Sequence, residues 1–217
     1  MDRGPALAPR PVSLTTGSAR LERVYAGHFD FSHPLYWTVP DLYAPDECLA
    51  IIGEADAHTW LPATVNRSKG REVDARVRNN TVAVLRDPKL AADAFDRVRP
   101  HVPARMTTEI ESRRVELGVH GVHLPMRIYR YDPGQFFGVH EDQSYFGADG
   151  SQSLLTYMVY LNDDFDGGAT EFTDQEVIIR PRTGMALLFQ HRTLHAGRSV
   201  TRGTKYVLRS DVLYRGG

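Results

Sequence analysis

The stretch Tyr131–Asp142 reads YDPGQFFGVHED and ends in a histidine and an aspartate two residues apart, His140 and Asp142. In an extended segment, side chains two residues apart project to the same side, so this imidazole and this carboxylate can point at one metal ion. Such a pair also arises by chance, and a metal site needs a third ligand from elsewhere. Two downstream histidines, His191 and His195, follow an apolar run, and one of them can supply it.

From Met126 onward, the chain around this stretch consists of short extended runs separated by turn residues. Glycine-rich and proline-containing turns, such as Asp-Gly-Gly at 166–168, separate the runs. This pattern is typical of an antiparallel sandwich or barrel. The predicted strands are Met126–Tyr131, Leu154–Leu161, Thr170–Thr173, Val177–Arg180, Met185–Gln190 and Lys205–Tyr214.

Two packing helices are predicted before the strand-rich region. Pro45, followed by two acidic residues, is typical of a first helical turn, and apolar residues then follow at helical spacing. Asp87 and Pro88 repeat this signal as N-cap and first helical residue, and Pro100 ends the run. No residue of these helices suggests a catalytic role, so we expect the helices to pack against the strands.

Length and composition favour one soluble domain. The 217 residues include 26 Lys or Arg and 27 Asp or Glu, and a net charge of -1 predicts no general attraction to nucleic acid or anionic membranes. We expect residues 1–20, which are rich in proline, to be a flexible tail and residues 21–217 to be a single domain with its core at 126–214. The single cysteine, Cys48, and the lack of a long apolar run predict a cytoplasmic protein.

Six sequence elements in one order resemble the iron(II)- and 2-oxoglutarate-dependent oxygenases of the prolyl 4-hydroxylase type. They are Y-x-x-G-Q at 131–135, H-x-D at 140–142, Y-L-N at 160–162, G-G-x-T-x-F at 167–172, P-x-x-G at 181–184 and the run from His195 to Lys205. The resemblance covers residues 127–214. It implies a β-rich α+β fold, namely a double-stranded β-helix or cupin-like jelly roll with supporting N-terminal helices.

The resemblance also implies a cofactor site at the mouth of the jelly roll. The implied iron(II) ligands, which are also the catalytic residues, are His140, Asp142 and His195. The implied 2-oxoglutarate residues are Lys205, Tyr131, Tyr160 and Thr156. Two imidazoles and one carboxylate leave three positions of an octahedral metal free, which is diagnostic of non-haem iron(II). Lys205 favours the oxoacid, because a lysine offers a compact positive charge for a terminal carboxylate.

The reaction implied by the resemblance couples decarboxylation of 2-oxoglutarate to succinate and carbon dioxide with hydroxylation of an unactivated C–H bond by O2. Ascorbate is expected to support it by keeping iron reduced. Collagen-type members carry a tryptophan near the position of Asp211, whereas the tryptophans here are Trp37 and Trp60. We therefore expect an amino acid, a small peptide or a natural-product-like substrate, with prolyl hydroxylation of a protein as the alternative. The sequence leaves the oligomeric state open.

Strand periodicity offers an independent test, because residues of one cavity must share a face of each strand. The predicted inner faces carry Thr156, Met158 and Tyr160, then Arg127, Tyr129 and Tyr131, and lastly Lys205, Val207, Arg209 and Asp211. Arg127, Arg209 and Asp211 are therefore predicted substrate-site residues. Arg209 either holds a substrate carboxylate or pairs with Asp211.

Two residues and one segment near the motifs also carry predictions. His191 is predicted to be a rim residue rather than a ligand, because the β context does not suit a helical pair with His195. Glu141 is expected to face away from the metal. Residues 71–80, REVDARVRNN, are either a solvated strand or loop, or a lid over the mouth of the jelly roll.

Three rival functions fit parts of the pattern. A nucleic-acid demethylase of the AlkB type shares the metal triad, but it uses arginines in the last strands, where this chain has Lys205. A zinc hydrolase on a similar barrel would need no cation beside its metal. A non-catalytic metal-binding sensor on the same fold usually shows degraded ligands, and all three are intact here.

Overall fold

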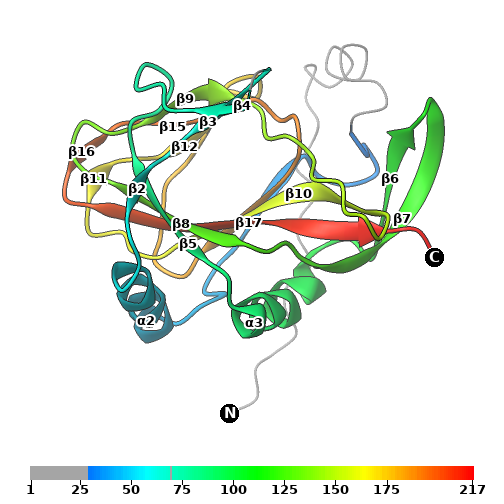
Figure 1. Ribbon diagram of the computed structural model, residues 1–217, viewed down its shortest axis with the longest axis horizontal. Helices are drawn as coiled ribbons and strands as arrows, with labels where there is room; N and C mark the ends of the chain where they lie inside the picture. Colours follow the sequence, from blue (N-terminus) through cyan, green and yellow to red (C-terminus); the bar gives the residue numbers. More distant parts are fainter. Residues whose placement is uncertain (1–28, 69) are drawn as a thin grey trace.

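A large antiparallel sheet crosses the molecule (Figure 1). The computed structural model describes residues 29–68 and 70–217, so the tail expected at 1–20 lies outside the described residues. The strands of this sheet follow the order β1 (Tyr36–Val39), β14 (Ala186–Gln190), β10 (Ser151–Tyr160), β17 (Lys205–Arg215), β8 (Met126–Tyr131), β5 (Thr81–Leu85) and β2 (Leu61–Pro62). A hairpin of β6 (Arg105–Ile110) and β7 (Arg113–Val122) joins it by pairing with β17.

A smaller antiparallel sheet lies on one side of the large one (Figure 1). Its order is β13 (Val177–Ile179), β12 (Thr170–Phe172), β15 (His195–Gly197) and β9 (Phe137–His140). Two short pairs complete the strands, namely β11 (Asp166–Gly167) with β16 (Val200–Arg202), and β3 (Val65–Arg67) with β4 (Gly70–Glu72). Two antiparallel sheets wound in this way form the predicted jelly roll.

Both predicted helices are present and cover the other side of the large sheet (Figure 1). α2 (Pro45–Asp56) begins at the predicted proline and carries two acidic residues in its first turn. α3 (Pro88–Val98) begins after Asp87, whose carboxylate accepts a 2.8 Å hydrogen bond from the backbone N–H of Lys89. A short 3-10 helix (Arg99–His101) follows α3. The helices thus begin where capping chemistry predicts.

The large sheet separates two apolar clusters. On the helix side, Leu155, Tyr157 and Val159 of β10 pack in one cluster with the buried faces of α2 and α3. On the other side, Tyr160 and Val207 pack with side chains of β12 and β14 between the two sheets. This confirms the predicted alternation of β10, and it reserves one face of the sheet for the cavity.

The strands predicted from Met126 onward are all present, although β10 begins three residues before its predicted start. The strands β5, β6 and β7 were not predicted. β5 reads TVAVL, in which Ala83 and Leu85 enter the core while Val82 and Val84 line a cavity. Both faces are therefore apolar, and the sequence lacks the alternation of apolar and polar residues that marks a strand. β6 and β7 project beyond the sheet and carry many exposed polar residues, so their burial does not alternate regularly.

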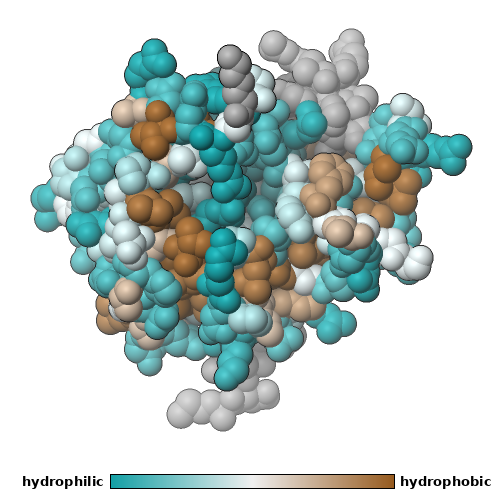
Figure 2. All heavy atoms as spheres, in the orientation of Figure 1, coloured by the Kyte–Doolittle hydropathy of each residue, from teal (hydrophilic) through white to brown (hydrophobic). Residues whose placement is uncertain are grey.

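Polar residues dominate the face drawn in Figure 2, where apolar side chains appear as separate patches. Within the described residues, no helix combines the length and the apolar character needed to cross a membrane.

Gly184 is a position where the fold requires glycine. Its φ of 77° is left-handed, and an added Cβ would collide with the backbone carbonyl of Tyr43. The same glycine ties the segment before α2 to the large sheet, because its carbonyl accepts hydrogen bonds from the N–H groups of Leu42 and Tyr43.

Replacing Gly184 by alanine should therefore lower the free energy of unfolding by about 2–4 kcal/mol, from backbone strain and overpacking together. Gly53→Ala is the matched control, because Gly53 lies in α2 with open space around it, and there alanine should stabilise by about 0.5–1 kcal/mol. Urea denaturation measures both. Equal effects of the two variants would contradict the assigned role of Gly184.

Candidate metal centre and adjoining cavity

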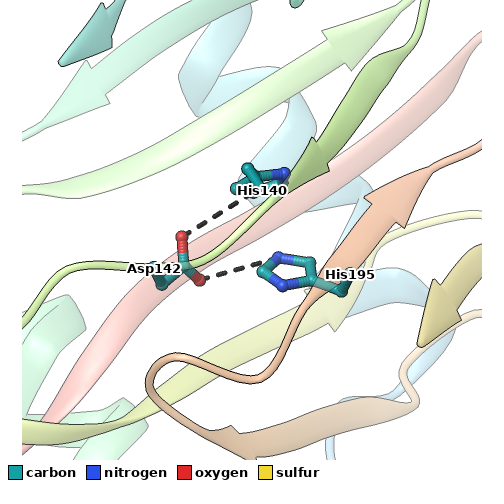
Figure 3. A group of neighbouring side chains, drawn as sticks. All are labelled: His140, Asp142 and His195. Atoms are coloured by element: carbon teal, nitrogen blue, oxygen red, sulfur yellow. Dashed lines mark ion pairs between the residues drawn. The ribbon is translucent and has the colours of Figure 1, made fainter. Parts of the chain in front are cut away.

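Neighbouring strands bring three potential metal ligands together. His140 ends β9 and His195 begins β15, and the antiparallel register places these two residues directly opposite each other. Asp142 follows β9 by two residues and turns back between them (Figure 3). Its two carboxylate oxygens lie 3.8 Å from the Nε2 atoms of His140 and His195, and the candidate ligand atoms all lie within 4.8 Å of one another.

Backbone carbonyls fix the orientation of both imidazoles. The Nδ1 of His140 lies 2.8 Å from the carbonyl oxygen of Gly138, and the Nδ1 of His195 lies 2.9 Å from that of Thr193. A carbonyl only accepts, so each Nδ1 carries the proton and donates it. Each Nε2 is then left with a free lone pair directed at Asp142, which is the tautomer that a metal ligand requires.

Burial and charge set the protonation of the three ligands. Burial lowers the pKa of His140 to about 3, assisted by His195, and burial also lowers the pKa of His195. Burial alone would raise the pKa of Asp142, but Arg209 and the surrounding imidazoles outweigh it and hold that pKa well below its usual range. At neutral pH the site therefore offers two neutral imidazoles and one carboxylate, the donor set of a divalent metal site.

Two side chains of the large sheet hold Asp142. The hydroxyl of Thr156 donates a 2.6 Å hydrogen bond to Oδ2 of Asp142, and Nη2 of Arg209 lies 3.1 Å from the same oxygen. Thr156 was expected to help bind 2-oxoglutarate near Lys205. The structure places its hydroxyl on the carboxylate of Asp142, and Thr156 lies four residues before Tyr160 along β10, about 13 Å in an extended strand.

A cavity of about 480 Å³ opens beside the three ligands. Besides the ligands, the predicted residues Tyr131, Lys205, Arg127 and Arg209 line it. Of the other residues expected on the inner faces of β8, β10 and β17, Tyr129, Met158 and Val207 also line the cavity. The lining does not include Thr156, Tyr160 and Asp211.

Lys205 lies buried at one end of this cavity. Its Nζ donates a 2.6 Å hydrogen bond to the carbonyl oxygen of Gly168 and lies 5.3 Å from the ring centres of Tyr131 and Tyr160. Among the described residues, no carboxylate forms an ion pair with it, and burial lowers its pKa to about 7. A buried ammonium with this surrounding suits an anionic ligand.

Two tyrosine hydroxyls lie near this end of the cavity. Burial raises the pKa of Tyr131 to about 12, partly offset by nearby Arg78, so the phenol stays protonated and can donate. The Tyr160 hydroxyl is 2.7 Å from Oγ1 of Thr170, which also lines the cavity. Thr170 was not among the predicted site residues, although it is the threonine of the G-G-x-T-x-F element.

At the other end of the cavity, Arg209 pairs with two carboxylates. Its Nη2 lies 3.1 Å from Asp142 and 3.1 Å from Oδ1 of Asp211, and these anions raise its pKa although burial acts in the opposite direction. Of the two readings left open, pairing with Asp211 is therefore present. Asp211 is buried, and the backbone N–H of His123 donates a 2.9 Å hydrogen bond to its carbonyl oxygen.

The predicted position of His191 at the rim is wrong. Only 4% of this residue is exposed, and its ring nitrogens lie 3.0 Å from Oγ of Ser153 and 3.4 Å from Oγ1 of Thr156. It is not a member of the ligand group, as predicted. It lies behind Thr156 because the turn after β14 folds back over β10 instead of opening towards solvent. Glu141, which was expected to face away from the metal, is exposed and also belongs to the lining of the cavity.

The segment 71–80 forms a wall of the cavity. Backbone hydrogen bonds connect Val77 and Asn79 to the segment around β9, and Arg78 is 4% exposed. The guanidinium of Arg78 lies 3.9 Å from the ring centre of Phe137 and 4.6 Å from that of Tyr129. The segment is therefore solvated only in part, because residues 71–73 and 75–76 are exposed while Asp74, Arg78 and Asn80 are buried. Nothing in the sequence distinguished Arg78 from the other arginines of the segment.

Comparison with known proteins agrees with this geometry. Residues 126–210 match the 2OG-Fe(II) oxygenase superfamily. Prolyl 4-hydroxylase 1 of Arabidopsis thaliana is 23% identical over 193 residues, 76% of this chain and 64% of that protein. A PKHD-type hydroxylase of Sphingopyxis alaskensis is 30% identical over 89 residues, 38% of this chain and 41% of that protein. This chain thus spans less than two thirds of the length of either relative.

A solved structure shows the same fold. The viral collagen prolyl hydroxylase of Paramecium Bursaria Chlorella virus-1, determined as a 2OG complex, superposes with a TM-score of 0.59 at 20% identity. The match covers 84% of this chain and 97% of that chain. The predicted double-stranded β-helix is confirmed.

The lowered pKa of Lys205 predicts how pH affects the binding of an anionic ligand at this lysine, for which 2-oxoglutarate is the probe. An incoming carboxylate raises that pKa, so above pH 7 the complex must take up a proton that the free protein has lost. The dissociation constant should then rise by up to about tenfold per pH unit between pH 7 and 9. Calorimetry of the Mn(II)-loaded protein measures this, and buffers of different ionisation enthalpy count the protons.

Lys205→Arg is the matched variant, because a guanidinium stays protonated over this whole range. Its dissociation constant should be nearly independent of pH. A wild-type protein that shows no proton uptake at pH 8 would contradict the pairing of Lys205 with the ligand.

Proposed function

Because this chain belongs to the 2OG-Fe(II) oxygenase superfamily and is of the prolyl 4-hydroxylase type, we propose that it is an Fe(II)- and 2-oxoglutarate-dependent dioxygenase. It would hydroxylate an unactivated C–H bond of an amino acid, small peptide or natural-product-like substrate. The observation that carries this proposal is one cavity lined by a His-Asp-His group and by a buried lysine that pairs with no carboxylate of residues 29–68 and 70–217. When bound, iron(II) and 2-oxoglutarate supply the activation of O2, with release of succinate and carbon dioxide.

His140, Asp142 and His195 are the residues that would hold iron(II). At neutral pH both imidazoles are neutral and the carboxylate is ionised, so none of the three residues must lose a proton when the metal binds. Three protein ligands suit iron(II) with an oxoacid better than structural zinc, which normally takes four. The hydrogen bonds from the imidazoles to backbone carbonyls would keep both rings aimed at the metal.

Lys205 would bind the distal carboxylate of 2-oxoglutarate. It lies opposite Tyr131 in the pairing of β17 with β8, so the ammonium and the phenol reach the same end of the cavity. The pair Tyr160 and Thr170 adds a second hydroxyl group there. A buried ammonium without a counter-ion is unfavourable in free energy. A carboxylate of 2-oxoglutarate would pair with it and offset that penalty, which favours binding.

The cavity wall would keep water away from the reacting groups. The ring of Phe137 stacks on His140 with 3.4 Å between ring centres, and Phe189 packs edge-on against His195 at 4.5 Å. These rings restrict the imidazoles and shield the ligand bonds from solvent. A site of this kind suits a short-lived oxidant, because fewer competing molecules reach it.

A protein prolyl residue is the second candidate substrate. The observation that favours it is the likeness to relatives named prolyl 4-hydroxylase and to a solved collagen prolyl hydroxylase. Against it, Asp211 is buried and paired with Arg209, where the sequence analysis expected a tryptophan in a collagen-type enzyme.

Succinate formation from 2-oxoglutarate in the presence of Fe(II), O2 and ascorbate tests the proposed activity. Asp142→Asn and His195→Ala should each lower it by about 100-fold or more, because loss of a ligand costs at least as much as loss of an outer hydrogen-bond partner. His120→Asn is the control, since His120 is half-exposed and faces Asp149, and it should retain wild-type rates.

A mass-spectrometric screen of amino acids, proline-containing peptides and natural-product scaffolds for a gain of one oxygen atom then separates the two substrate classes. Wild-type protein that consumes no 2-oxoglutarate under any of these conditions would exclude an oxygenase and favour a sensor. Hydrolysis by the zinc form would favour a hydrolase instead.

A further inference from the structure

The cavity carries an excess of positive charge. Among the described residues, its lining includes six basic side chains and two carboxylates. The basic residues are Arg67, Arg71, Arg78, Arg127, Lys205 and Arg209. The carboxylates are Glu141 and Asp142. Low-dielectric walls strengthen such an imbalance and favour an anionic ligand.

Most of these cations already have partners. Arg67 pairs with Glu72 and Asp74 at 3.0 Å each. Arg209 is bound by Asp142 and Asp211, as described above. Arg78 donates from Nε to Asn80 and is stacked on two aromatic rings, although its buried Nη2 has no hydrogen-bond partner among the described residues. Lys205 is assigned to 2-oxoglutarate under the proposed function.

Among the described cations of the cavity lining, Arg127 is the half-buried one with neither an ion pair nor a side-chain hydrogen bond. Among the described residues, no carboxylate forms an ion pair with it and no side chain accepts a hydrogen bond from it. Burial lowers the pKa of its guanidinium, and neighbouring Arg209 contributes to that shift. A half-buried guanidinium without an anion is suited to bind a carboxylate from a ligand. Among the described residues, no side chain of β8 or β17 supplies that carboxylate.

The position of Arg127 separates it from the expected site of 2-oxoglutarate. It lies opposite Arg209 in the pairing of β8 with β17, whereas Tyr131 lies opposite Lys205. The pair Arg127 and Arg209 is four residues along the strands from the pair Tyr131 and Lys205, which is about 13 Å in extended strands. Asp142 contacts Arg209, so the metal ligands adjoin the level of Arg127. One ligand anion at Lys205 therefore leaves Arg127 free for another molecule.

We propose that the substrate carries a carboxylate and that Arg127 binds it at the end of the cavity away from Lys205. Exposed Arg71, which lines the same cavity, adds positive charge near the entrance. The carboxylate belongs either to a free amino acid or to an acidic side chain of a peptide, and both present the same planar pair of oxygens to a guanidinium. This inference rests on the proposed function, because it assigns Lys205 to the cosubstrate.

Binding of matched probes tests this inference without relying on turnover. Protein loaded with Zn(II) and 2-oxoglutarate is titrated with free amino acids and their primary amides, and with Gly-Glu-Gly and Gly-Gln-Gly amides, by ligand-observed NMR. At least one acid should bind about tenfold or more tightly than its amide. Preference for a free amino acid or for Gly-Glu-Gly amide identifies the source of the carboxylate.

Arg127→Met should reduce the affinity of that acid to the level of its amide, while Arg127→Lys should retain part of the preference. Arg130→Met is the matched control, because Arg130 lies on the opposite face of β8 and pairs with Asp132 at 3.1 Å. It should leave the preference unchanged. The dissociation constant of 2-oxoglutarate, measured separately, should stay within about threefold in all three variants.

Equal affinity for acids and amides, or an acid preference that survives Arg127→Met, overturns the inference. A loss of 2-oxoglutarate binding in Arg127→Met also overturns it, because Arg127 would then serve the cosubstrate. Failure of 2-oxoglutarate to bind the wild-type protein overturns the proposed function instead, and the contrast between acid and amide still reports on Arg127 alone.

Discussion

The antiparallel pairing of β9 with β15 is the constraint on which the site depends. It sets His140 against His195, and the chain leaving β9 returns Asp142 between them. A shift of this register by one residue would turn one imidazole to the opposite face of the smaller sheet. The pairing of β12 with β15, in which Phe172 lies opposite His195, supports the same register from the other side.

A buried charged site also requires compensation within the protein. Asp142 is ionised although it is largely buried, because Arg209 and the hydroxyl of Thr156 bind it. Arg209 is in turn held by Asp211, and His191 lies 3.8 Å from the same carboxylate. The large sheet thus contributes a polar network beneath the ligands, and each of its members comes from the cavity face of β10 or β17 or from the turn after β14.

Much of this site follows from sequence because its motifs lie on strands with strict alternation. The phase of β10 and β17 predicted that Met158, Lys205 and Arg209 lie on one cavity face, and His140, Asp142 and His195 matched a known order of motifs. Contacts between segments far apart in the sequence could not be predicted in this way. The wrong rim position of His191 and the omission of Arg78 both concern which segment covers a residue, and alternation does not encode this.

The central claim is that the three ligands and Lys205 form one binding site for a metal and an oxoacid. Anaerobic addition of 2-oxoglutarate to the Fe(II)-loaded protein tests it directly, because chelation of Fe(II) by an oxoacid produces a visible absorption band. The account predicts a band that saturates at one equivalent in the wild-type protein and needs far more 2-oxoglutarate in Lys205→Met. Absence of the band in the wild-type protein, or identical titrations of the two proteins, would contradict it.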